Sequence, residues 1–419
     1  MQRRDFLKYT SALAFSGMCP SIFANDNSNL SKRRLILIEL KGGNDGLNTL
    51  IPYKDPLYEE LRPSINLLAK PKKGGKPAIP KQYINIDDHL GIGLNDQLKF
   101  LVQNNKLKSD VAILHSVGSP KVNKSHFTGI KFWENGSTNL TKQGWIARAL
   151  DDNKKLTKGT TTQGVVIGDK ILGPFTRTTS DVLIVDDLKR MLKKDNIDRF
   201  EDKDARGNHN LRHVFDTETS IRKQLEKFSE NIGDLNSIKG TGFEKDVETL
   251  IKITSVFPQI PAFKLSLGGF DTHRSQSATH RKLLAKLNTG LKGLVDGLRE
   301  HNLYDSTLIM TYSEFGRRPK QNSSGGTDHG EANCHFLLGG KVKGGQIYYG
   351  KNANLQAGKG GYDLSTDHKD AKNNLEYKID FRDVYQEILT DWWKVKGLDK
   401  YAEVGYNPED QHKLNFLKA

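Results

Sequence analysis

The sequence has few cysteines and lacks any long apolar run. Only two cysteines, Cys19 and Cys334, occur in 419 residues. A transmembrane helix needs about 20 consecutive apolar residues, and no stretch approaches that length. There is no internal repeat and no basic stripe interleaved with aromatic side chains. These absences argue against an integral membrane protein, a disulfide-rich domain and a repeat protein, and they leave nucleic-acid binding as a weak interpretation.

Positive charge is the clearest bias of the composition. The chain has 64 Lys and Arg residues against 50 Asp and Glu, a net charge of +14. Such a charge suits an anionic partner, so we expect an anionic small molecule or polysaccharide as substrate. The 36% of hydrophobic residues is ample for a large core, in one big domain or two ordinary ones.

The N-terminus is typical of an export signal. The run Arg3–Lys8 resembles a twin-arginine motif, and a short apolar run follows it. We expect cleavage near Ala24, so that residues 1–24 are a signal peptide. The remaining chain would hold Cys334 alone and no transmembrane anchor, and it would reside in the periplasm or be secreted. Its oligomeric state is not predicted.

Apolar runs and helical spacing alternate along the rest of the chain. Strands are predicted at 34–40, 111–117, 164–168, 181–185, 262–267, 306–312 and 334–338. Helices are predicted at 125–135, after His273, and from Asp380. The polar helical block 187–253 interrupts the strands, and we interpret it as an inserted helical subdomain or lid.

Carboxylates and histidines follow several of these strands. Three strands end in turns that carry such residues, and a fourth loop adds two more. They are Asp45, Asp271, His273, Glu314, Asp328 and His329. The ends of parallel strands meet at one edge of a sheet, so these side chains can converge there on a divalent metal such as Zn²⁺, Mn²⁺, Mg²⁺ or Ca²⁺, one ion or two. Each residue alone has a simpler interpretation, as a turn former, a helix cap or a surface histidine.

Ser125 is a candidate nucleophile. It follows a strand, stands where a helix begins, and has Lys124 and His126 beside it. A helix N-terminus favours a seryl oxyanion or a bound phosphate, although a serine there also serves as a plain N-cap. Arg317 and Arg318 are either a clamp for an oxyanion or a solvated pair.

Several rare motifs occur in a characteristic order. They read LIELKGGNDGLNTLIPY, SHFTGIKFWENG, GGFDTH, YSEFGRRPKQNSSGGTDHG and KIDFRDVYQEIL. This pattern resembles a large family of bacterial twin-arginine-exported proteins known mainly as a domain of unknown function. That family is similar to the alkaline phosphatase, sulfatase and phosphoglycerate mutase superfamily. The resemblance implies an α/β fold over residues 25–419, with a mixed, largely parallel central sheet between helical layers and a metal-dependent site at the strand ends.

The resemblance also implies roles for individual residues. The implied metal ligands are Asp45, Asp271, His273, Glu314 and His329. Ser125 matches the nucleophile segment. Beside it, we expect Lys124 or Arg317 to contact the oxygens of the substrate. Two departures, Phe315 in place of a histidine and the short spacing from Asp271 to His273, leave one metal or two open.

Two hypotheses follow. The first is an exported metal-dependent hydrolase of phosphate or sulfate esters. The alternative is a catalytically degenerate exported protein of the same fold that binds a partner protein or an acidic polysaccharide.

Overall fold

The computed structural model describes most of the chain downstream of the expected signal peptide. The described residues are 32–71, 78–121, 123–140, 142–160, 162–186, 241–351, 353, 355–362, 364, 374–397 and 412–418. The expected signal peptide 1–24 lies outside them, as do residues 187–240 of the expected insertion. In the described ranges, no helix combines the length and apolarity that crossing a membrane requires.

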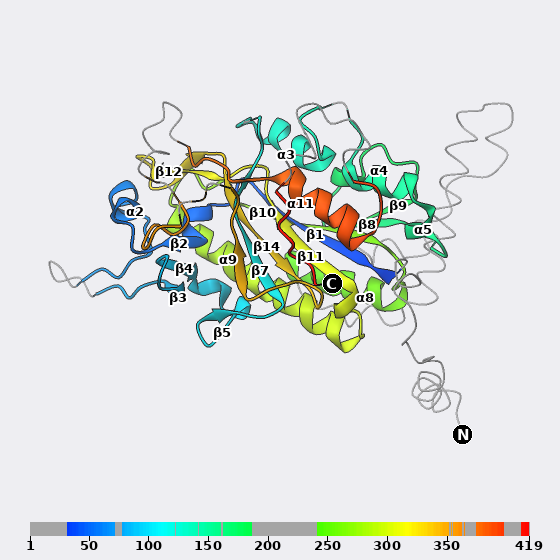
Figure 1. The fold of residues 1–419 in the computed structure, drawn as a ribbon, viewed down its shortest axis with the longest axis horizontal. Coiled ribbons are helices and arrows are strands. Elements are labelled where there is room, and N and C mark those ends of the chain that lie inside the picture. The colour runs from blue at the N-terminus through cyan, green and yellow to red at the C-terminus, as the bar shows by residue number, and fades with distance from the viewer. Residues whose placement is uncertain are drawn as a thin grey trace, which may run out of the picture. The chain divides into compact units, whose positions relative to one another are not determined.

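A nine-stranded sheet forms the centre of the described part (Figure 1). Its strands are β1 (Arg34–Lys41), β7 (Val111–Gly118), β8 (Gly164–Ile167), β9 (Val182–Val185), β10 (Ala262–Gly268), β11 (Thr307–Tyr312), β14 (Asn333–Leu338), β15 (Gln346–Tyr348) and β16 (Ile379–Asp380). The spatial order is β15-β7-β14-β11-β1-β10-β8-β9, and β16 pairs with β7.

Every pairing in this sheet is parallel except the two made by β14. β14 runs antiparallel to β11 and to β7, whereas the pairs of β1, β8, β9, β10, β15 and β16 are parallel. The carboxyl ends of eight strands and the beginning of β14 therefore lie at one edge. The predicted mixed, largely parallel sheet is confirmed.

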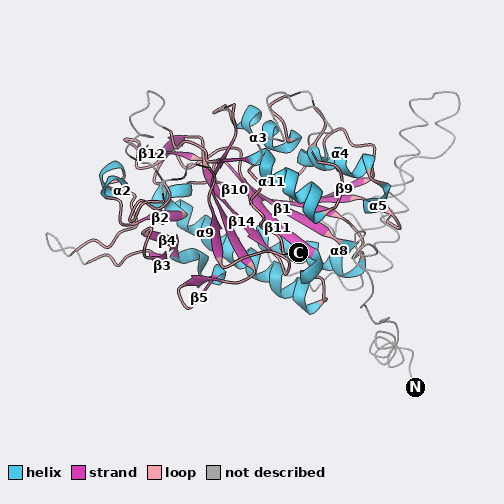
Figure 2. Cartoon of the chain, viewed as in Figure 1, coloured by secondary structure: helices cyan, strands magenta, loops and turns pink. Residues whose placement is uncertain are grey.

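Helices cover both faces of the sheet (Figure 2). One layer holds α3 (His126–Asn135), α4 (Trp145–Asp152), α5 (Lys154–Thr157), α11 (Phe381–Glu387) and the π-turn η9 (Ile388–Trp392). The other holds η3 (Asp96–Leu101), α8 (Phe243–Val256) and α9 (Gln276–Glu300). Side chains of β1 alternate between them, because successive residues of a strand point to opposite faces. Leu35 and Leu37 pack with α3, α4 and α11, and Ile36 and Ile38 with α8 and α9.

Residue spacing explains the longest helix. In α9 the buried Leu284, Leu287, Leu291, Leu294 and Leu298 recur every three or four residues, which places them on one face. α8 packs against the same cluster through Val247, Leu250 and Ile253. The described end of the expected 187–253 insertion is thus part of the helical layer that covers the sheet.

Smaller elements surround the sheet. They are η2 (Gly46–Asn48), β2 (Leu50–Pro52), α2 (Pro56–Leu61), β3 (Tyr83–Asp87), β4 (Ile92–Asn95), β5 (Val102–Gln103), β6 (Lys106–Leu107), η4 (Gly173–Phe175), η8 (Tyr304–Ser306), β12 (Arg317–Gln321) and β13 (Thr327–His329). β12 and β13 form an antiparallel hairpin in which Arg317 pairs with His329. This hairpin connects β11 to β14 at the carboxyl edge of the sheet.

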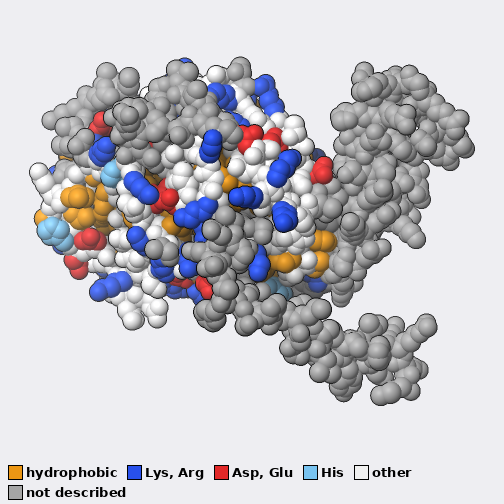
Figure 3. Space-filling view, turned by 45° about the vertical axis from the view of Figure 1, so that its right-hand side comes forward, with side chains coloured by type: hydrophobic (Ala, Val, Ile, Leu, Met, Phe, Trp, Pro, Cys, Tyr) orange, Lys and Arg blue, Asp and Glu red, His pale blue; other side chains and the backbone are white. Residues whose placement is uncertain are grey.

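Basic side chains are dispersed over the surface. Figure 3 shows Lys and Arg scattered across the visible face, with no single stripe. On this face the distribution agrees with the sequence, in which basic residues are scattered along the chain.

Candidate metal centre

Three histidines and one aspartate meet at the carboxyl edge of the sheet. His126 is the first residue of α3, shortly after β7. Asp271 and His273 follow β10, and His329 ends β13. Because β14 is antiparallel, the segment before it lies at the same edge as the segments after the other strands. His329 therefore precedes its neighbouring sheet strand, β14, whereas the other three residues follow theirs.

The imidazoles converge on a single carboxylate oxygen. Asp271 Oδ1 lies 3.4 Å from Nε2 of His126, 3.0 Å from Nε2 of His273 and 3.2 Å from Nε2 of His329. The Nε2 atoms of His273 and His329 are 2.9 Å apart. Four side chains from three segments thus face one small volume.

The other ring nitrogens identify the tautomers. Nδ1 of His329 lies 2.7 Å from the backbone oxygen of Lys124, which only accepts, so this nitrogen carries the proton. Nδ1 of His126 lies 2.7 Å from Oε1 of Glu314 and donates in the same way. In the neutral rings the Nε2 lone pairs then point to the shared centre. Nε2 of His126 is buried there without a hydrogen-bond partner.

This arrangement fits a divalent cation. Among the described residues, the ligand atoms of His126, Asp271 and His329 all lie within 4.8 Å of one another. Two imidazoles and a carboxylate are donors that suit Zn²⁺ or Mn²⁺, and the imidazole of His273 contacts the same carboxylate oxygen. Histidines that bind metals commonly donate their second N–H to a carboxylate or a backbone carbonyl, as His126 and His329 do here. Nε2 of His273 lies 2.9 Å from Nε2 of His329, a contact that requires a proton or a cation between the two nitrogens.

Arg317 fixes Asp271 in place. Its buried guanidinium donates to Asp271 Oδ1 at 2.7 Å and to the backbone oxygens of Gly42, Gly43, Phe270 and Thr327. Burial raises the pKa of Asp271, but the hydrogen bond from Arg317 and its positive charge outweigh burial and lower the pKa to about 2. Every nitrogen of the guanidinium is engaged, so Arg317 positions a ligand and is not free to clamp a substrate.

Glu314 contacts the cluster through His126. Its Oε1 accepts from Nδ1 of His126 at 2.7 Å and from the backbone N–H of Gly42 at 2.9 Å. The hydrogen bond with Glu314 raises the pKa of His126, while burial lowers the pKa of His329. The structure gives Glu314 the place of a partner to a histidine ligand.

Gly42 makes this meeting of loops possible. Its φ is +117°, and an added Cβ would overlap the backbone nitrogen of Asp271. Only glycine adopts such a conformation readily and allows this close approach. The Gly42-Gly43 turn therefore serves to bring the loops after β1, β10 and β11 into contact.

Asp45 is held away from the histidines by an ion pair. Its two oxygens bond Arg62 at 2.6 Å and 3.0 Å, and Gln276 also donates to it. Burial raises the pKa of Asp45, but the charge of Arg62 outweighs this and the pKa is lowered. Asp45 is fully buried and lies outside the group of converging ligand atoms. The structure thus gives it a structural partner and does not bring it to the centre.

Ser125 and Lys124 border the centre. Lys124 supplies the carbonyl that accepts from His329, and Ser125 lies between Lys124 and His126. Ser125 occupies the N-cap position of α3, yet its side chain makes no capping hydrogen bond. It is exposed, so the hydroxyl is accessible to solvent.

His126 is a candidate ligand that the sequence alone did not indicate. It was noted only as a neighbour of Ser125, although it follows β7 as the other candidates follow their strands. Phe315 stands where the superfamily comparison expects a histidine, and its ring packs 4.9 Å from that of His126 and 4.6 Å from that of His329. Phe315 thus covers one side of the centre and packs against the imidazoles of His126 and His329.

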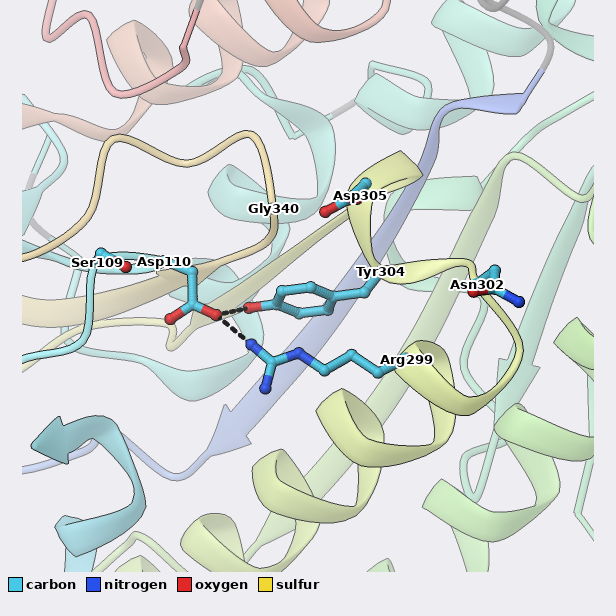
Figure 4. A pocket seen from close by; sticks show the side chains of 7 residues that line it. All are labelled: Ser109, Asp110, Arg299, Asn302, Tyr304, Asp305 and Gly340. Carbon is cyan, nitrogen blue, oxygen red and sulfur yellow. Dashed lines mark hydrogen bonds and ion pairs between the residues drawn. The ribbon is translucent and has the colours of Figure 1, made fainter. Parts of the chain in front are cut away.

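A cavity of about 400 Å³ lies at the opposite edge of the sheet from the metal centre. Figure 4 shows Arg299 and Tyr304 pointing to Asp110, which accepts from them at 2.6 Å and 2.8 Å. Asp110 immediately precedes β7 and Tyr304 precedes β11. These bonds tie the beginnings of the strands to the end of α9, which is a packing role.

An α/β protein with a candidate metal centre at the carboxyl edge of its sheet is the class that this structure defines. The chain belongs to the family described as protein of unknown function (DUF1501), which matches residues 144–400. The predicted family of unknown function is therefore confirmed. No curated protein matches the sequence.

Solved structures are similar in fold at low identity. The lipoteichoic acid synthase LtaP from Listeria monocytogenes has 8% identity and a TM-score of 0.35, covering 78% of this chain and 72% of its own. The alkaline phosphatase from the Antarctic bacterium TAB5 has 13% identity and a TM-score of 0.33, covering 75% and 94%. The PsFucS1 sulfatase from Pseudoalteromonas sp. has 12% identity and a TM-score of 0.34, covering 84% and 69%. Similarities of this size carry no information on site residues or substrate.

Proposed function

We propose that the chain is an exported, metal-dependent hydrolase of phosphate or sulfate esters. The observation that carries the proposal is the convergence of the Nε2 atoms of His126, His273 and His329 on Oδ1 of Asp271. These four residues would hold one divalent ion, with Zn²⁺ or Mn²⁺ best suited to the donor set. Export through residues 1–24 to the periplasm or beyond is part of the proposal.

The bound metal would polarise the ester and favour the ionised form of a nearby nucleophile. The residues around it keep the ligands in place: Arg317 holds Asp271, and Glu314 holds His126 by its Nδ1–H. Phe315 keeps water from one side of the imidazole rings. The positions of Asp271 and His126 are thus fixed before a substrate arrives.

Ser125 is the proposed nucleophile. Its Oγ attacks phosphorus or sulfur and gives its proton to water, so that a new O–P or O–S bond forms as the ester oxygen leaves with its electron pair and takes up a proton. Water then cleaves the new bond and restores the serine. Lys124 is proposed to stabilise the equatorial oxygens. An unmodified serine favours phosphate esters over sulfate esters, because dedicated sulfatases commonly use a modified residue.

The experiment begins with metal content. The purified protein is loaded separately with Zn²⁺, Mn²⁺, Mg²⁺ and Ca²⁺, and then assayed on aryl phosphate, phosphodiester and aryl sulfate. We expect one metal per chain and turnover of a phosphate ester. His126→Ala and Asp271→Asn should lose the metal, Ser125→Ala should keep the metal and lose turnover, and the exposed His89→Ala should keep both. An absence of metal and of turnover in the unmodified protein would refute the proposal.

The alternative is a binding protein of the same fold without turnover. Arg317 favours it, because the guanidinium expected to contact substrate oxygens is fully engaged by the protein itself. Tight metal binding with no turnover on any ester, together with capture of an acidic polysaccharide or a partner protein, would support it.

A further inference from the structure

A cleft of about 410 Å³ opens directly beside the metal centre. His126, Asp271 and Glu314 line it on one side. Its volume falls in the range of about 300–1,000 Å³ that is usual for small-molecule sites. The side chain of Asp271 is 47% exposed, so the centre is open to solvent and to whatever occupies the cleft.

Apolar side chains border the same cleft. Phe127 and Ile130 come from α3, and Ile171 comes from the loop after β8. Phe127 is 84% exposed and Ile171 57%. Only three other large hydrophobic residues among those described are exposed, Ile79, Leu140 and Leu355, and none of them lines this cleft. Two of five exposed hydrophobic side chains therefore flank one opening, next to a metal ligand.

Charges at the far side of the cleft are already paired with one another. Lys264 is buried and contacts Glu39 at 2.9 Å and Asp169 at 3.0 Å. Lys41 contacts Asp169 at 2.7 Å. These groups neutralise each other, so the floor does not offer a second anion site. Lys131, which is exposed, and Glu134 also line the cleft from α3, and the rest of its surface is the apolar border.

We propose that this border is the subsite for the apolar group of the substrate. The substrate class is an ester or anion with one charged oxyanion head and an aryl or alkyl group. The head lies at the metal centre, and the apolar group lies between Phe127 and Ile171. Phe127 directly follows His126, so the apolar border begins next to a proposed metal-binding residue. This inference rests on the proposed function for the position of the head, and it adds the chemistry of the rest of the molecule.

Calorimetric titration with alkylphosphonates tests the inference without turnover, because the carbon–phosphorus bond is not an ester. Methyl-, butyl- and hexylphosphonate are titrated into metal-loaded protein. Burying a methylene strengthens binding by about threefold to fourfold, so butylphosphonate should bind roughly 30- to 60-fold more tightly than methylphosphonate if its three added methylenes are buried.

Two variants locate the effect. Phe127→Ser combined with Ile171→Ser should leave methylphosphonate binding unchanged and remove most of the gain with chain length. Ile79→Ser is the matched control, because Ile79 is 44% exposed and does not line the cleft. It should keep the full gain. All three substitutions are at exposed sites, and thermal unfolding confirms that the variants remain folded.

The outcomes separate this inference from the proposed function. Chain-length-dependent binding with no hydrolysis of any ester refutes the hydrolase and supports the subsite. Hydrolysis with affinity that does not depend on chain length refutes the subsite and leaves the hydrolase standing. No binding of any phosphonate overturns the subsite, as does light scattering that shows a dimer dissociated by the double variant, since the border would then cover a second copy of the chain.

Discussion

Replacing Arg62 by methionine should strongly destabilise the protein. Arg62 is fully buried and bonds both oxygens of Asp45. It also donates to Asn48 and to the backbone oxygens of Arg318 and Pro319. Removing one partner of a buried ion pair costs about 3–5 kcal/mol, because the other charge is left uncompensated. Because three further acceptors each lose a donor, we expect the cost of Arg62→Met to fall near the upper end of that range.

The stability lost in Arg62→Met should increase with pH. With Arg62 present, the lowered pKa of Asp45 contributes stability above the unfolded pKa of about 3.9, and this is lost as pH falls through the folded value. Without Arg62, burial raises the pKa of Asp45 above its unfolded value. The variant then loses stability as pH rises toward 7. Urea unfolding followed by tryptophan fluorescence at pH 4, 5.5 and 7 should show a difference that widens at each step.

Two controls separate the structural role of Asp45 from metal binding. The double variant Asp45→Leu, Arg62→Met should recover much of the lost stability, because an apolar pair often replaces a buried ion pair without cost. Asp45→Asn should keep its metal, whereas Asp271→Asn should lose it. A cost of less than about 1 kcal/mol for Arg62→Met at pH 7, together with loss of the metal from Asp45→Asn, would contradict a structural role for Asp45.

Other substitutions test neighbouring parts of the same edge. Glu314→Gln should weaken metal affinity by about 10- to 100-fold, because it loosens His126; chelator competition measures this, and an unchanged affinity contradicts the assignment. Gly42→Ala should destabilise by more than about 1 kcal/mol in urea, since its φ is +117°; a neutral result would show that the turn relaxes. Lys264→Met should cost about 3–5 kcal/mol, because it leaves Glu39 buried and unpaired, and a loss under 1 kcal/mol in urea would contradict this.

The strands and main helices were predictable because their signals are local. The apolar runs of β1, β7, β10 and β11 and the leucine spacing of α9 depend only on neighbouring residues. The direction in which β14 runs cannot be predicted from neighbouring residues. Its predicted range, 334–338, is compatible with either direction. Had it run parallel to β11, His329 would lie at the opposite edge of the sheet, far from the residues after β10.

The site was predictable in part for the same reason. Asp271, His273 and His329 are brought together as the strand-end rule suggests. The same rule also selects Asp45, but the partner of Asp45 is Arg62, which reaches it through the turn after α2. A charge that neutralises a carboxylate across such a turn cannot be recognised from sequence spacing. His126 was not predicted as a ligand, because the neighbouring Ser125 was interpreted as the reactive residue of that segment.

The charges of the centre bear on which partner it attracts. With neutral histidines, Asp271 and Glu314 contribute two negative charges and Arg317 one positive charge. These residues therefore sum to minus one, which repels an anion. A divalent ion reverses the sign to plus one and makes the ion the largest local charge. The same edge that repels an oxyanion when empty would then attract it when loaded, so phosphonate binding should require the metal. The positive surface of the chain increases the encounter rate with anions in either state, but it does not provide this selectivity.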